Sequence, residues 1–152
     1  MSMSLALIVH IFLAILWVGG MAFAHVVLRP SSEFLDLKPR VLLWHGVLGR
    51  FLPLVWVAVV GLPLSGYTMI FVGFGGLAAI GPAIWVMQVV GWWMIGLFLY
   101  VYFKPYQRLR YMVKEELFPE AGLYMLRIRR IMLTNLILGT LVVLFAAGGR
   151  YW

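Results

Sequence analysis

The chain has 152 residues and no cysteine. That absence excludes disulfides, thiolate metal sites and cysteine-held iron–sulfur clusters. Any metal ion or cofactor iron must therefore be bound by histidine, methionine, asparagine, glutamine, tyrosine or carboxylate side chains. The histidines are few, and they stand at positions 10, 25 and 45.

Charged residues are also scarce. They make up 11% of the chain and apolar residues 64%, whereas soluble domains carry about 25% charged residues. Four apolar blocks, at residues 4–28, 43–72, 82–103 and 125–147, are each long enough to cross about 30 Å of hydrocarbon. We therefore predict an all-α fold, a four-transmembrane-helix bundle forming a single integral membrane domain over residues 1–152. No basic region precedes the first block, so we expect it to stay as a span and not to act as a removable signal peptide.

Carboxylates are absent from all four predicted spans, because the acidic residues are Glu33, Asp36, Glu115, Glu116 and Glu120. This argues against a proton-driven pump. Eleven of the twelve Lys and Arg residues gather around the connections between spans 1 and 2 and spans 3 and 4, whereas "GFGGLAAIGPA" at residues 73–83 carries none. The positive-inside rule then predicts that both termini face outward, to the periplasm if the chain lies in a bacterial inner membrane. The net charge of +7 is expected to meet lipid head groups and not nucleic acid.

Two features of the predicted helices depend on proline. Pro53 and Pro63 stand inside the second block, where each removes a backbone hydrogen bond, so we expect that helix to tilt or kink. The inner connection, residues 104–122, has the pattern of a short amphipathic surface helix, which we expect to end near Pro119.

Histidines inside a span are costly and are therefore candidate functional residues. His10 and His25 lie fifteen residues apart in the first span, roughly 22 Å along a helix, so they cannot bind one ion together. The helical period predicts that His10, Trp17, Met21 and His25 share one broad face. His45 is expected at the depth of His25 on the next, antiparallel span, where the two imidazoles could bind one haem iron from opposite sides. The alternative is that His25 and His45 only contact head groups and that His10 is a packed, hydrogen-bonded side chain.

Arginines are expected at the same inner level as His25 and His45. Their guanidinium groups pair well with carboxylates such as haem propionates; the candidates are Arg29, Arg50 and Arg130, with Arg40, Arg127 and Arg129 near them. Gly20 and Ala24 stand four residues apart, a spacing that would let a flat macrocycle approach the backbone or would simply serve helix packing.

The outer half of the bundle offers no second histidine to pair with His10. Met69, Met87 and Gln88 are expected at suitable depths opposite it, and a thioether is an accepted axial ligand of haem iron. Otherwise a haem on His10 would be five-coordinate, with one open face for small-molecule chemistry. The aromatic side chains of the third span are typical of packing or of an interfacial belt, with contact to a quinone or porphyrin as the alternative.

The stretch "HIFLAILWVGGMAFAHVVLRP" and the ending "RIRRIMLTNLILGTLVVLFAAGGR" resemble the first and last spans of CopD-like membrane domains and of HemJ-type protoporphyrinogen oxidases. The resemblance implies a four-helix plan in which His10 is the haem ligand, with Trp17 and Gly20 in register behind it. The chain departs from those oxidases by having Gln88 in place of a lysine, and Asn135 without the Glu and Pro of their last span. CopD-like proteins are associated with copper uptake, which implies His and Met ligands.

These patterns favour a membrane haem b protein of redox function, a cytochrome with one or two haems. His25 and His45 would form an inner ligand pair, and His10 would bind a second haem or the only one. Electron transfer to a partner protein is then the minimum activity, and a quinol, a reactive oxygen species or a porphyrin would be the substrate of an oxidoreductase. The alternatives are CopD-like copper transport along His10, Met21, His25 and His45, and a small accessory subunit whose histidines only pack. Small residues four apart, such as Gly61 and Ser65, permit helix association and hence a homo-oligomer.

Overall fold

The computed structural model describes residues 2–148, which form helices and short connections with no strand among them. Four helices are long and apolar enough to cross a membrane: Met3–Ser31, Leu37–Gly73, Pro82–Lys114 and Phe118–Gly148. The predicted all-α fold with four membrane helices is therefore confirmed.

The N-terminal helix, Met3–Ser31, is not a uniform α-helix. Its α-helical parts are α1 (Met3–Ala14), α2 (Gly20–Ala22) and α3 (Arg29–Ser31), and π-helical stretches join them at Ile15–Gly19 and Phe23–Leu28. A π-helical turn holds more residues than an α-helical one, so it rotates everything that follows relative to an ideal helix. The buried stripe of this helix runs through Ala6, Leu13, Trp17, Met21 and Ala24. His25 follows Ala24 directly and is half-buried at the end of this stripe.

The second membrane helix, α4 (Leu37–Gly73), continues without interruption through Pro53 and Pro63. It begins at Leu37, earlier than residue 43 where the apolar block starts. The extra turn carries Lys38 and Arg40, which a membrane helix tolerates at its inner end because these side chains reach the head groups.

The third membrane helix is divided into α5 (Pro82–Phe103) and α6 (Pro105–Lys114), which meet at Lys104. A short 3₁₀ turn, Leu77–Ala79, precedes it. The last membrane helix, α7 (Phe118–Gly148), begins earlier than the predicted residue 125. The prediction that the amphipathic helix ends near Pro119 was wrong. Pro119 lies in the first turn of α7, where its missing N–H has no helical partner to lose.

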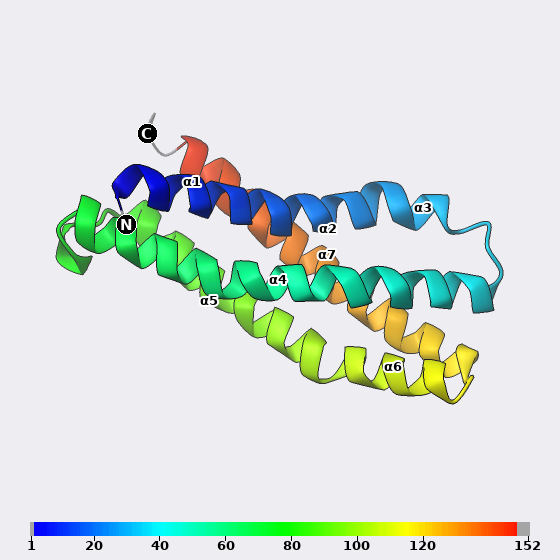
Figure 1. The fold of residues 1–152 in the computed structure, drawn as a ribbon. Helices are drawn as coiled ribbons and strands as arrows, with labels where there is room; N and C mark the ends of the chain where they lie inside the picture. The colour runs from blue at the N-terminus through cyan, green and yellow to red at the C-terminus, as the bar shows by residue number, and fades with distance from the viewer. Residues whose placement is uncertain (1, 149–152) are drawn as a thin grey trace.

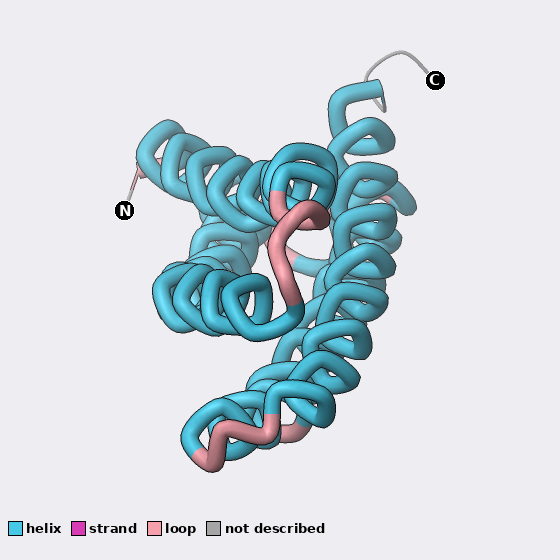
Figure 2. Tube along the Cα trace, turned by 90° about the vertical axis from the view of Figure 1, so that its right-hand side faces the viewer, coloured by secondary structure: helices cyan, strands magenta, loops and turns pink. Residues whose placement is uncertain are grey.

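The four membrane helices form two layers. The N-terminal helix packs along α4, and α5 and α7 cross behind this pair while α6 packs on α7 (Figure 1). The start of α1, the end of α7 and the connection at residues 74–81 lie at one end of the bundle, which we call the outer end after the predicted orientation. The connections at residues 32–36 and 115–117 lie at the other, which we call the inner end. Viewed from the side, the chain shows α7 running beside both the N-terminal helix and the α5–α6 segment (Figure 2).

Glycines let the helices approach closely at three points of the core. Gly20 lies under the ring of Phe51 on α4, which packs in the space that a side chain at position 20 would take. Gly61 of α4 lies under Leu13 of α1 in the same way. At Gly139 of α7, an added Cβ would lie 2.8 Å from Val18 Cγ2 and 3.0 Å from Met94 Cε. Such contacts supply van der Waals packing where lipid removes the hydrophobic driving force.

We expect Gly139→Ala to lower the thermal unfolding midpoint in detergent, because the new methyl meets side chains of two other helices. Val18 is β-branched and cannot easily turn away, and overpacking of this kind costs about 1–3 kcal/mol. The matched control is Gly91→Ala on α5, where an added Cβ meets nothing within 4 Å. An equal decrease in both variants would show that the close approach at Gly139 is not what destabilises the protein.

Candidate functional site

His10 is the histidine with a defined side-chain partner on another helix. Its Nδ1 lies 2.9 Å from Ser65 Oγ on α4. Ser65 is buried, and an added Cβ at the neighbouring Gly66 would lie 3.4 Å from His10 Cε1. A side chain at position 66 would therefore be in van der Waals contact with the imidazole ring.

The hydrogen bonds of Ser65 favour one tautomer of His10. Ser65 Oγ lies 2.6 Å from the carbonyl oxygen of Gly61 and 3.1 Å from that of Leu62. When the hydroxyl proton goes to Gly61, Ser65 Oγ accepts a hydrogen bond from His10 Nδ1–H, and His10 Nε2 keeps its lone pair. Metal-bound histidines usually donate their other ring N–H to a partner in this way.

The outer half of the bundle, around His10, is covered unevenly. α1 and α4 bury Ala6, Ser65 and Ile70 there, whereas α5 buries no side chain before Met94. Met69, Met87 and Gln88 are half-buried at this level, and none of them has a hydrogen bond to His10 in the described part of the chain. The large side chains of residues 82–93 are mostly exposed, namely Trp85, Val86, Val89, Trp92 and Trp93.

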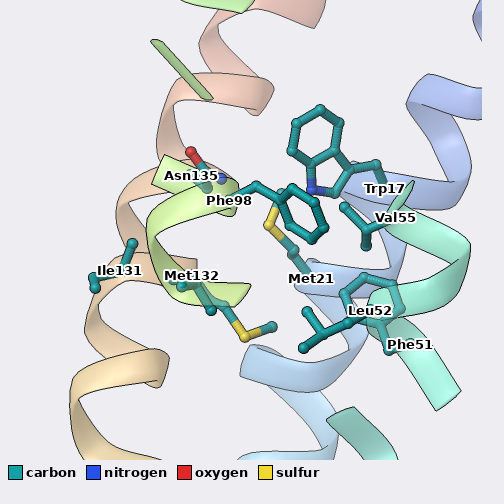
Figure 3. Close-up of a pocket in the computed structure, with 10 residues that line it drawn as sticks. Trp17, Met21, Phe51, Leu52, Val55, Phe98, Ile131, Met132 and Asn135 are labelled. Carbon is teal, nitrogen blue, oxygen red and sulfur yellow. The ribbon is translucent and has the colours of Figure 1, made fainter. Parts of the chain in front are cut away.

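A small apolar pocket lies at the centre of the bundle, farther along the N-terminal helix than His10. Figure 3 shows side chains from every membrane helix around it, among them Trp17, Met21, Phe98 and Met132. Trp17 is 4% exposed and packs edge to face against Phe98, with ring centroids 6.2 Å apart. The predicted cofactor contact Trp17 is therefore part of this core. It is separated from His10 by two helical turns.

Asn135 of α7 is the polar side chain at the wall of this pocket. Its Nδ2 donates a hydrogen bond to the Met94 carbonyl oxygen of α5 at 3.2 Å. Its Oδ1 is buried without a hydrogen-bond partner in the described residues. Asn135 therefore joins α7 to α5, and it leaves one acceptor unused inside the bundle.

A cluster of charged residues lies between the N-terminal helix, α4 and α7 at the inner end of the bundle. Arg29 Nε lies 3.4 Å from Glu33 Oε1, and Arg129 Nη2 lies 4.0 Å from the same oxygen. The guanidinium of Arg129, only 9% exposed, also lies over the ring of Trp44, 5.4 Å from its centroid. Arg40 is within electrostatic reach of Arg129, and its Nε is buried with no hydrogen-bond partner among residues 2–148. We call Arg29, Arg40 and Arg129 the inner arginine cluster. Its positive charge is larger than the single negative charge of the neighbouring Glu33.

The structure does not bring the three histidines together: the described residues contain no group of three histidine or acidic side chains able to hold a metal ion. His25 lies within electrostatic reach of Arg29 and Arg129. His45 follows the buried Trp44 and is half-buried. Neither His25 nor His45 has a hydrogen bond within residues 2–148. Of the predicted propionate partners, Arg29 belongs to the inner arginine cluster, whereas Arg50 and Arg130 are exposed.

Three residues of these sites were not predicted as site residues. Ser65 was noted only for its spacing from Gly61, although a lone serine deep in a span is itself a signal for a polar partner. Arg129 was one of several neighbouring arginines, and nothing in the sequence marks it as the buried one. Ser32 looks like a loop residue, yet its hydroxyl accepts from Trp44 Nε1 at 3.2 Å and donates to the Arg29 carbonyl oxygen at 2.9 Å.

Comparison of the chain with models of protein families, with curated proteins and with solved structures finds no match. Its function is therefore inferred from its own residues.

We expect Ser32→Ala to lower the thermal unfolding midpoint, because it leaves the Trp44 indole N–H buried without an acceptor. A loss of this kind costs about 1–3 kcal/mol. Ser31→Ala is the matched control, since Ser31 is the exposed neighbour whereas Ser32 is 1% exposed. A midpoint unchanged in both variants would mean that water replaces the hydroxyl.

Proposed function

We propose that the chain is a membrane haem b protein with a redox function and that His10 is an axial ligand of the haem iron. The observation that carries the proposal is the hydrogen bond from His10 Nδ1 to the buried Ser65 Oγ. This contact orients the imidazole inside an apolar span, where a polar side chain without a partner is costly.

The donor set fits haem iron. The chain has no cysteine, so an axial ligand comes from histidine, methionine or tyrosine. His10 presents Nε2, and Ser65 with Gly66 supplies the orienting hydrogen bond and the space beside the ring. The exposed tryptophans of residues 82–93 add flat apolar surface in the same half of the bundle.

When bound, haem supplies a centre that takes up and releases one electron. The chain itself holds the imidazole, excludes water through its apolar surroundings and raises the basicity of Nε2 through the Ser65 hydrogen bond. Met69 and Met87 stay as candidates for the sixth position. If that position is open, the outer face is available to a quinol, a reactive oxygen species or a porphyrin; if it is filled, electron transfer to a partner is the activity.

A second haem at His25 and His45 is part of the same proposal. The inner arginine cluster supports it, because Arg29 and Arg129 lie near His25 and carry more charge than Glu33 balances. Haem propionates are carboxylates, which guanidinium groups bind well. The partnerless Nε of Arg40 is one donor available to such a group.

We further propose that the protein lies in a bacterial inner membrane with both termini in the periplasm. The distribution of basic residues supports this orientation through the positive-inside rule. A quinone or a redox protein is the expected partner, and helix association through small residues would form a homo-oligomer. Copper transport along His10, Met21, His25 and His45 is the alternative. Copper binding by the same purified protein tests this alternative.

We expect the protein, purified in mild detergent after expression with added haem, to show the reduced-minus-oxidised spectrum of haem b. His10→Ala should remove the signal of the haem that His10 binds. Ser65→Ala should lower haem occupancy at a limiting haem concentration by roughly 10-fold or more, as for other partners of metal-bound histidines.

Thr68→Ala is the matched control for Ser65→Ala. Thr68 lies on the same helix, and its hydroxyl donates to the Leu64 carbonyl oxygen at 2.8 Å without touching His10. A full signal in His10→Ala, with loss in His25→Ala or His45→Ala, would move the site to the inner end. A wild-type protein without haem would contradict the proposal, and equilibrium dialysis against copper would then test the alternative.

A further inference from the structure

An open basic pocket lies where the third membrane helix bends at Lys104. It encloses about 720 Å³, its mouth included, and six residues define it here as the bend pocket: Tyr100, Phe103, Lys104, Arg108, Tyr124 and Arg127. The end of α5, the start of α6 and α7 thus share one recess at the inner end of the bundle.

Three cations face this recess, and no carboxylate lines it. Lys104, Arg108 and Arg127 form no ion pair within residues 2–148; the ion pairs found there all involve Glu33. Like charges held together repel each other, and a bound anion would offset that repulsion. The neighbouring Gln107 is already engaged, with its Nε2 donating to the Tyr102 carbonyl oxygen at 3.2 Å and its Oε1 accepting from Arg110 at 3.3 Å.

The apolar side chains of the bend pocket favour a lipid over a free ion as the bound anion. Tyr100 is 45% exposed and Phe103 59% exposed, and both lie on the last turns of α5, directly above the cations. Tyrosine at such a place is typical of the membrane interface. A phosphate group held by the cations would therefore carry its glycerol and acyl chains along exposed aromatic surface.

We propose that the bend pocket binds the phosphate head group of an anionic phospholipid of the inner leaflet. Arg108 and Arg127 contact the phosphate, Lys104 adds charge at the rim, and Tyr100 and Phe103 contact the acyl chain. Basic pockets between membrane helices on the cytoplasmic side are suited to such head groups. The inference does not depend on haem.

Native mass spectrometry of the full chain in mild detergent tests the proposal. The protein is titrated with phosphatidylglycerol and, separately, with phosphatidylcholine of the same acyl chains. We expect wild type to prefer phosphatidylglycerol and Arg108→Gln/Arg127→Gln to lose about fivefold in that preference for each cation removed, roughly 25-fold together.

The matched control is Arg110→Gln/Lys114→Gln, which removes the same charge from α6 without altering a residue that lines the pocket. Equal loss in the control would overturn the proposal, and so would a preference retained in Arg108→Gln/Arg127→Gln. Displacement of the lipid by millimolar inorganic phosphate would contradict the proposal that the bound phosphate belongs to a lipid, and would indicate a site for free phosphate. The single variants Arg108→Gln and Arg127→Gln, with thermal midpoints measured in the same detergent, keep the test valid if the double variant does not fold.

Discussion

A polar group inside hydrocarbon finds no water, so it must find its partner within the protein. The structure follows from this constraint at two places. Ser65 satisfies its hydroxyl on its own helix and then holds His10, which joins the N-terminal helix to α4. Asn135 donates to the Met94 carbonyl oxygen and joins α7 to α5. Each of these two polar contacts links the helices of one layer of the bundle.

Between these contacts the helices are held together by close van der Waals packing. Lipid tails are as apolar as leucine, so burying apolar surface between membrane helices gains little, and close packing must supply the attraction. Gly20, Gly61 and Gly139 each receive a larger side chain from another helix. The π-helical stretches at residues 15–19 and 23–28 turn Trp17, Met21 and Ala24 toward this packing and leave His25 at its edge.

The two ends of the bundle carry different chemistry because charge is sorted along it. Among residues 2–148, the outer half holds His10 and exposed tryptophans and no charged side chain of α1, α5 or the end of α7. The inner end holds the arginine cluster around Glu33 and, separately, the bend pocket with its three cations. The apolar surroundings of the first region favour an uncharged side chain with an internal partner, whereas the excess positive charge of the second region attracts anionic groups.

The sequence by itself determined the four spans, the all-α fold and the absence of carboxylates inside them. Each of these depends on the cost of moving a residue into hydrocarbon, which is a property of that residue alone. It also marked His10 as costly and therefore as a candidate ligand. Only the tertiary structure decided that His10 meets Ser65, that Arg129 is the buried arginine, and that Lys104, Arg108 and Arg127 share a pocket. Those outcomes depend on the rotation and bending of one helix against another. Two π-helical stretches and the bend at Lys104 change that rotation in ways that a regular 3.6-residue period cannot predict.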